Sequence, residues 1–257
     1  MRIESPHVVL AYTKDFVNKI GKTKYKEYLN HLEEAYVKYS ELTGSTPCGG
    51  DKIYITNTDE PIMKGYGGMA NFNPILVELN QSATASDIKK YNTTGLGILH
   101  EMGHKFDEAH EIEDAGEEYG WLFDGELLPN IKMLYILDST DDIGIYHNGY
   151  LCYSSEDYAK YCKEKYDESF ENGTYGGDGM HYLFIKVVEK IGWEPFKKTF
   201  REYVNTKDYN SQHNNNYEKF KTFIDSLQKN YNPVGTEVYD IFSDRDMEII
   251  YEEYIQG

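Results

Sequence analysis

The segment Gly95–His104 reads GLGILHEMGH and carries the pattern His-Glu-x-x-His at His100, Glu101 and His104. In a helix, residues four apart lie one above the other on the same face, so the two imidazoles can hold one metal ion. Zinc suits this ligand pair, and Glu101 would lie beside a water molecule at the ion. The ion would lower the pKa of that water, and the carboxylate would take the proton. The motif therefore predicts one catalytic Zn2+, with His100 and His104 as ligands and Glu101 as general base.

The residues around the motif predict that it is helical. Apolar side chains recur at helical spacing, at Leu96, Leu99, Met102 and Phe106. Gly97 and Gly103 oppose this, because each lowers helix stability by roughly 1 kcal/mol relative to alanine. At these two glycines we expect close packing against another segment.

Composition narrows the class of partner. The 257 residues include 44 Asp and Glu against 26 Lys and Arg, which gives a formal net charge of -18. Such a balance argues against binding to nucleic acid or to an anionic membrane surface. No apolar run is long enough to span a bilayer, so we expect no membrane insertion. We expect the chain to act as a monomer.

The cysteines and the first residues bear on location. Three cysteines do not make a disulfide framework, although the spacing would permit one bridge, for example between Cys152 and Cys162. Met1 is followed by the polar run RIESP, so no signal peptide is visible. Because the chain passes almost at once into a strand-like run, we expect a domain excised from a longer secreted or cell-surface protein. The alternative is a cytoplasmic protein.

Periodicity divides the chain into two parts of one domain. Residues 1–92 mix strands with one long amphipathic helix, and residues 93–257 are mostly helical, which gives an α+β fold. In the first part, we expect strands at His7–Thr13, Lys52–Thr58 and Ile75–Leu79, and a helix over Thr23–Leu42 that Thr23 caps and Gly44 ends. In the second part, helices are expected over Ser155–Tyr166 with Ser155 as cap, Met180–Ile191, Pro195–Tyr203, Tyr217–Leu227 and within Val238–Tyr254.

A catalytic zinc usually has three protein ligands, and the sequence offers three kinds of candidate for the third. His110 stands at the spacing found in metzincins, but Asp107 replaces the glycine that allows their sharp turn. An acid-rich run supplies Glu111, Glu113, Glu117 and Glu118, which read most simply as a solvated loop. Glu126 lies among apolar residues, and a carboxylate in such a setting needs a partner, which the metal would provide. The alternative is that Glu126 faces solvent from an amphipathic helix.

The runs TTGLGILHEMGHKFD and GELLPNIKMLYIL resemble the enhancin-like zinc metallopeptidases, which include viral enhancins and bacterial mucin-degrading peptidases within the gluzincin group. Glu126, Asn130 and the pair Leu134-Tyr135 match the layout of the family's downstream segment. HYLFIKVVEKIGWEPFKKTFREY looks like its following helix pair, and GYGGMANF loosely resembles its cleft-edge segment. The resemblance covers roughly residues 50 to 205.

The resemblance implies a zincin-like fold, with the active-site cleft between the mixed N-terminal part and the helical C-terminal part. It implies that His100, His104 and Glu126 hold zinc and that Glu101 is the general base. The implied reaction is cleavage of peptide bonds in proteins, in particular mucin-like glycoproteins. Pro129 departs from a regular helix in this segment, so the helix should start near Glu126 or kink there.

Several roles stay open. The donor that stabilises the oxyanion is expected among His181, Tyr182, Tyr119 and Tyr146. Asn130 is the polar residue most readily placed next to an imidazole of the site. Two other functions compete with the gluzincin peptidase. One is a metzincin or toxin-type protease with His110 as third ligand. The other is a non-catalytic glycan- or mucin-binding module on a zincin fold, which would have no need of Glu101.

Overall fold

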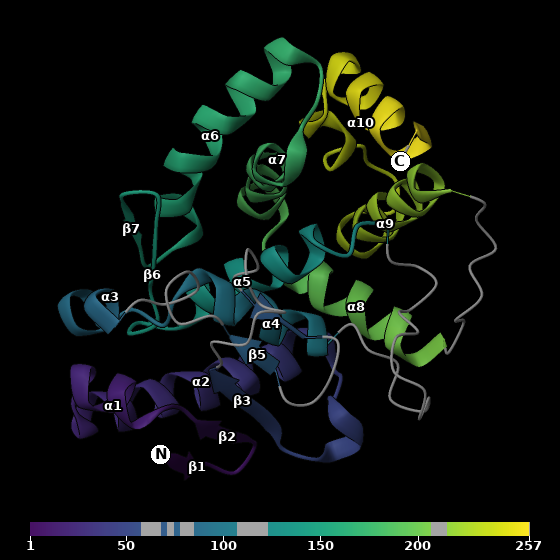
Figure 1. The fold of residues 1–257 in the computed structure, drawn as a ribbon. Coiled ribbons are helices and arrows are strands. Elements are labelled where there is room, and N and C mark those ends of the chain that lie inside the picture. The colour runs from purple at the N-terminus through teal and green to yellow at the C-terminus, as the bar shows by residue number, and fades with distance from the viewer. Residues whose placement is uncertain (58–67, 71–74, 78–84, 107–122, 207–214, 257) are drawn as a thin grey trace.

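The strands of the first 77 residues form one mixed sheet at one end of the molecule (Figure 1). The computed structural model describes residues 1–57, 68–70, 75–77, 85–106, 123–206 and 215–256. The strands are β1 (Arg2–Glu4), β2 (Val8–Ala11), β3 (Ile53–Asn57), β4 (Gly68–Met69) and β5 (Ile75–Val77), in the order β1-β2-β3-β5-β4. The three central strands β2, β3 and β5 are parallel, and the edge strands β1 and β4 are antiparallel to their neighbours. In β2, Val8, Val9 and Leu10 are all fully buried, as expected for a strand covered on both faces.

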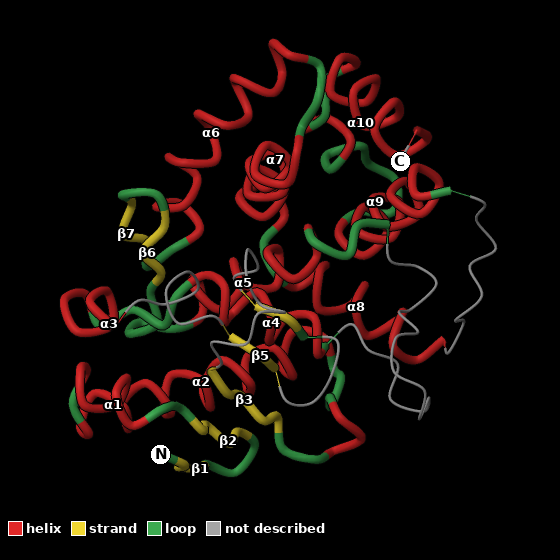
Figure 2. The backbone as a smooth tube through the Cα atoms, in the orientation of Figure 1, coloured by secondary structure: helices red, strands yellow, loops and turns green. Residues whose placement is uncertain are grey.

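Helices dominate the rest of the described chain (Figure 2). They are α1 (Lys14–Ile20), α2 (Lys22–Thr43), α3 (Ala85–Tyr91), α4 (Leu96–Lys105), α5 (Leu127–Ser139), α6 (Ser155–Asn172), α7 (Gly176–Ile191), α8 (Glu194–Thr206), α9 (Asn216–Tyr231) and α10 (Asp244–Gln256). Short 3-10 turns lie at Cys48–Gly50 and Tyr239–Ile241, and a hairpin joins β6 (Ile145–His147) to β7 (Tyr150–Cys152). The chain is therefore an α+β protein that is mostly helical, as predicted.

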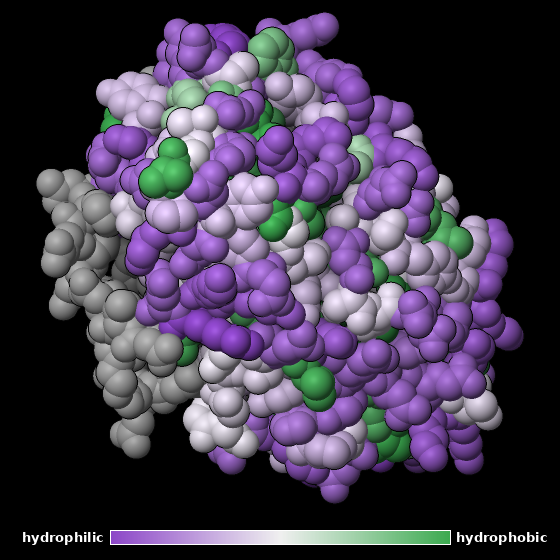
Figure 3. All heavy atoms as spheres, turned by 180° about the vertical axis from the view of Figure 1, so that it is seen from behind, coloured by the Kyte–Doolittle hydropathy of each residue, from purple (hydrophilic) through white to green (hydrophobic). Residues whose placement is uncertain are grey.

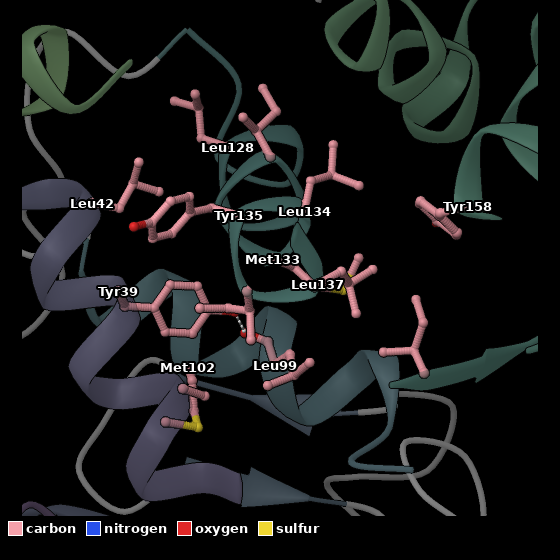
Figure 4. Packing of buried hydrophobic residues seen from close by; sticks show 14 of the residues in the cluster. Tyr39, Leu42, Leu99, Met102, Leu128, Met133, Leu134, Tyr135, Leu137 and Tyr158 are labelled. Carbon is pink, nitrogen blue, oxygen red and sulfur yellow. Dashed lines mark hydrogen bonds between the residues drawn. The ribbon is translucent and has the colours of Figure 1, made fainter. Parts of the chain in front are cut away.

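Helix α5 lies at the centre of the core. Every residue from 127 to 137 except Asn130 is buried, because α2, α4, α6 and α7 all pack against this helix. Figure 4 shows Tyr39 and Leu42 of α2, Leu99 and Met102 of α4, and several leucines of α5 meeting in one apolar cluster. Burial of this kind stabilises by roughly 25 cal/mol per Å² of apolar surface.

The surface is mainly polar on the face seen from behind. The face opposite to that of Figure 1 is mainly hydrophilic, with only scattered apolar residues (Figure 3). Among the described residues, no helix combines the length and the hydrophobicity needed to cross a membrane.

Several local predictions were wrong. Strand β1, helices α1 and α3 and the β6–β7 hairpin were not predicted. Helix α2 begins at Lys22 after Gly21, so Thr23 is not its cap. Ser154, not Ser155, caps α6, since its side chain accepts the amide of Asp157. Cys152 and Cys162 are both buried free thiols, so the bridge that their spacing would permit is absent.

Candidate metal centre

Helix α4 orients the two histidines of the motif. It begins after Gly95, whose φ of 94° is a conformation that glycine adopts readily. Ile98, Leu99 and Met102 are fully buried, whereas His100 and His104 are only partly buried on another side of the helix. The apolar periodicity thus fixes the rotation of α4, and this rotation leaves the imidazoles at the edge of the core.

Asp124 and Pro129 set the start of α5 and with it the position of Glu126. The Oδ1 atom of Asp124 accepts the amides of Glu126 at 3.0 Å and of Leu127 at 2.9 Å, as a capping carboxylate does. Pro129 lies in the first turn, where a missing amide proton costs nothing. The helix therefore starts next to Glu126, as expected from Pro129, and Glu126 projects from its end.

The expected burial of Glu126 is wrong. Its side chain is 80% exposed, because the neighbouring Leu127 and Leu128 turn into the core while Glu126 points outward. The apolar neighbours in the sequence therefore do not surround the carboxylate. What places Glu126 beside the histidines is the packing of α5 against α4.

The two helices approach unusually closely at one glycine. A Cβ atom on Gly103 would lie 2.9 Å from Pro129 Cα and 3.0 Å from Pro129 O, closer than real Cβ atoms come to backbone. Gly103 thus permits the close packing that the sequence predicted at the glycines of this helix. This contact brings the first turn of α5 within reach of the histidines of α4.

The three predicted ligands converge. The Nε2 atoms of His100 and His104 are 3.0 Å apart. Glu126 Oε2 lies 3.1 Å from His100 Nε2, and Glu126 Oε1 lies 3.9 Å from His104 Nε2. Among the residues that the structure describes, these three form the one group of His, Cys, Asp and Glu with ligand atoms all within 4.8 Å of one another.

These separations fit a tetrahedral zinc. Ligand bonds of about 2.0 to 2.1 Å at tetrahedral angles separate the ligand atoms by about 3.4 Å, close to the spacings of the triad. Two imidazole nitrogens and one carboxylate oxygen also match the donor set of a catalytic zinc, which keeps a fourth position open.

Asn130 supplies a second reason to expect a cation. Its amide group donates to the backbone oxygen of Glu126 at 3.2 Å, which leaves its Oδ1 to accept from His100 Nδ1 at 2.9 Å. With the proton on Nδ1, neutral His100 presents a lone pair at Nε2 toward both His104 and the carboxylate of Glu126. Such facing lone pairs repel each other unless a positive charge lies between them, either a second proton or a metal ion. The sequence analysis named Asn130 as a partner for an imidazole, and Asn130 does contact His100.

Burial and hydrogen bonds shift the pKa values of the site residues in different directions. Burial, followed by the charge of His100, holds the pKa of His104 well below its usual value, so His104 is neutral and able to bind a metal. Burial lowers the pKa of His100, but the bonds to Glu126 and Asn130 outweigh it and leave the pKa raised. Burial also raises the pKa of Glu101 to about 7, because this residue is only 8% exposed. A carboxyl group that titrates near neutral pH can both take up and release a proton.

The other predicted site residues lie elsewhere. His181 is 2% exposed, with its ring near Tyr158 and its Nδ1 atom 3.5 Å from Asp178. Tyr182 packs its ring on Tyr166 at 5.1 Å. Neither arrangement presents a donor to the triad, so the expectation that these two residues line the cleft is not supported by their contacts. Packing between α6 and α7 accounts for both side chains, with His181 buried and Tyr182 partly buried.

Tyr146 stacks on Tyr91 with ring centroids 4.8 Å apart. The remaining candidates, His110, Glu111, Glu113, Glu117, Glu118 and Tyr119, lie outside the described residues.

Asp124 and Lys132 contact the site but were not predicted from the sequence. Asp124 stands three residues before an apolar helical run, which is a capping signal. Lys132 is the one cation in the apolar run LLPNIKMLYIL that follows Glu126, and a charge in such a run indicates a buried polar contact. Its Nζ atom donates to Gly103 O at 2.8 Å.

Comparison with known proteins supports the fold alone. No protein-family profile matches the chain, and no curated protein sequence matches it. A crystal structure described as a functionally unknown conserved protein from Bacillus anthracis str. Ames is similar, with a TM-score of 0.58 and 14% sequence identity. The similarity covers 98% of this chain and 51% of that one, so the chain spans about half the length of that protein.

Proposed function

We propose that this chain is a zinc-dependent endopeptidase with a zincin-like fold, in which His100, His104 and Glu126 hold the metal. The observation that carries the proposal is the convergence of these three side chains within 4.8 Å, next to the acid of the His-Glu-x-x-His motif. The contact between Glu126 and both histidines favours the gluzincin arrangement over one that uses His110.

When bound, zinc would polarise the scissile carbonyl group and lower the pKa of the attacking water. Glu101 would take the proton from that water and pass it to the leaving amine. Asn130 would hold His100 in the tautomer whose Nε2 faces the metal.

The sheet offers a place for an extended substrate. Strand β4, Gly68–Met69, is the last strand at one edge and contacts α4. An extended peptide can add to such an edge through backbone hydrogen bonds, which would bring its scissile bond toward the motif helix. The cleft would then lie between the sheet and the helical part of the chain.

The narrower proposal concerns the substrate and its location. The resemblance of the motif segments to enhancin-like peptidases supports mucin-like glycoproteins as substrates and a secreted or cell-surface setting. The net charge of -18 supports a partner other than nucleic acid.

The test compares four variants of the purified protein for zinc content and for cleavage of casein and a mucin. Glu101→Gln should bind zinc like the wild type and lose at least about 100-fold in cleavage rate, since general-base catalysis contributes roughly that much or more. His104→Ala should lose both zinc and activity. His31→Ala, a histidine of α2, and Glu189→Gln, on the exposed side of α7, are the matched controls and should keep both.

The proposal is refuted if the wild type carries no zinc, or if Glu101→Gln cleaves as fast as the wild type. Binding of mucin without cleavage by any variant would favour the non-catalytic module instead.

A further inference from the structure

Two carbonyl groups of α4 receive hydrogen bonds from side chains of other helices. The Leu99 carbonyl accepts from the Tyr39 hydroxyl of α2 at 2.8 Å, a bond drawn in Figure 4. The Gly103 carbonyl accepts from Lys132 Nζ of α5, also at 2.8 Å. Leu99 and Gly103 are four residues apart, so the two carbonyls lie on the same stripe of the helix.

Each of these carbonyls belongs to the peptide group that leads into a histidine of the motif. The Leu99 carbonyl is joined to the amide of His100, and the Gly103 carbonyl to the amide of His104. The direction in which an imidazole leaves the helix depends on the orientation of its backbone. A contact that fixes these two peptide groups therefore fixes the directions of both imidazoles.

Burial makes the Lys132 contact costly. The residue is 0% exposed, and an ammonium group removed from water loses hydration that its partners must replace. An apolar side chain of similar length would fill the space without that loss. What a cation or another donor provides is a second bond to the Gly103 carbonyl, which already accepts the Phe106 amide at 3.1 Å and carries partial negative charge near the end of α4.

The bond from Lys132 to Gly103 also links the two helices, α4 and α5, that supply the metal ligands. Lys132 lies on the same helix as Asn130 and follows Glu126 by six residues, so its bond to Gly103 ties the third ligand to the backbone next to His104. On the other side, Tyr39 packs on Phe106 with ring centroids 5.2 Å apart, in addition to its bond to Leu99. Helix α4 is thereby held from α2 and from α5.

We propose that Tyr39 and Lys132 are positioning residues of the metal centre, which hold His100 and His104 at the spacing that the ion requires. This inference rests on the proposed function, because it assumes that the triad binds a metal. The physical reason is that metal affinity depends on ligand distances within about 0.2 Å, a tolerance that a free helix end would exceed.

The experiment is a titration of the metal-free protein with Co2+ alone, followed by visible absorption, which reports both affinity and coordination geometry. Lys132→Met should raise the dissociation constant about 10- to 100-fold, since it removes one hydrogen bond from a charged donor. Tyr39→Phe should raise it about 3- to 10-fold, since it removes one neutral hydrogen bond. Both variants should change the shape of the cobalt spectrum.

Tyr175→Phe is the matched control. It removes an equally buried tyrosine hydroxyl that bonds to Asp246 of α10, so it lowers stability without touching α4. All titrations are made well below the unfolding temperature of each variant. Tyr39→Phe keeps the test valid even where Lys132→Met does not fold.

Three outcomes are informative. Weakened binding and an altered spectrum in the Tyr39 and Lys132 variants, with Tyr175→Phe like the wild type, support the inference. Wild-type affinity and spectrum in Tyr39→Phe and in folded Lys132→Met overturn it and leave the proposed function intact. Failure of the wild type to bind Co2+ overturns the proposed function and this inference with it.

Discussion

The substitution Gly103→Ala tests how tightly the two ligand-bearing helices must pack. An alanine Cβ would lie 2.9 Å from Pro129 Cα and 3.0 Å from Pro129 O, and both are backbone atoms that no rotamer change can move. Non-bonded carbon atoms prefer a separation of about 3.5 to 4.0 Å. Helices α4 and α5 would therefore have to separate by roughly 0.6 to 1 Å.

The effect on stability should be small and the effect on metal binding large. Overpacking typically costs about 1 to 3 kcal/mol, and the gain in helix propensity from glycine to alanine offsets about 1 kcal/mol of that. The metal-free protein should therefore lose no more than about 2 kcal/mol of unfolding free energy. A helix displacement of roughly 0.6 to 1 Å exceeds the tolerance of about 0.2 Å for ligand distances. Zinc affinity should therefore fall at least about tenfold.

The assay is thermal unfolding of the metal-free protein and of the protein at a fixed free zinc concentration. Each tenfold loss of affinity removes about 1.4 kcal/mol of the zinc-induced stabilisation when zinc is in excess. Gly179→Ala in α7 is the control, because the nearest neighbours of the added Cβ atom would be side-chain atoms of Tyr175 and Ser169, so it should keep the stabilisation by zinc. The reasoning is wrong if Gly103→Ala is stabilised by zinc as much as the wild type, since α5 would then not set the position of Glu126.

Two further predictions concern the partners of the helices. Asn130→Ala should weaken zinc binding about 10- to 100-fold with little loss of stability, because His100 loses the acceptor that fixes its tautomer. Competition with a chelator measures the zinc affinity, and an unchanged affinity would contradict this prediction. Hydrogen bonds from Tyr135, then from Lys197, lower the pKa of Glu41 to about 2, so the stabilisation from its charged form should be present above about pH 4.5 and be lost as the pH falls toward 2. In urea unfolding between pH 5 and pH 2, Glu41→Gln should therefore lose less stability than the wild type, and an equal loss would refute the assignment.

Local sequence signals predicted the elements that carry the site. The apolar spacing around the motif predicted helix α4. The same kind of pattern predicted α2, although not its N-terminal cap, and the central strands. Asn130 was named as a polar neighbour of the site, and the resemblance to the enhancin-like segment drew attention to the same residue. Pro129 indicated where α5 begins, since proline is tolerated only in the first turn.

Long-range packing accounts for what the sequence did not predict. The exposure of Glu126 depends on which way the start of α5 faces, and only the contact with α4 decides this. His181 precedes an apolar run much as a cleft residue would, yet it is buried, with its ring near Tyr158 of the preceding helix α6. The hairpin β6–β7 was missed although Asn148-Gly149 is a hairpin turn signal, because each of its strands has only three residues.

The bond from Lys132 to Gly103 shows the same limit. A cation within an apolar run indicates a buried polar partner, but 29 positions separate the two residues, and the sequence does not say which carbonyl is met. The contact exists because Gly103 lets α5 approach, so two unrelated local signals meet only in the folded chain.

The central claim is that one metal ion is held by two histidines of α4 and one glutamate from the start of α5. A crystal grown with zinc, measured on both sides of the zinc absorption edge, tests it most directly. We predict a single strong anomalous peak bonded to His100 Nε2, His104 Nε2 and the carboxylate of Glu126. No peak at this position, or a peak with Glu126 turned away from the ion, would contradict the account.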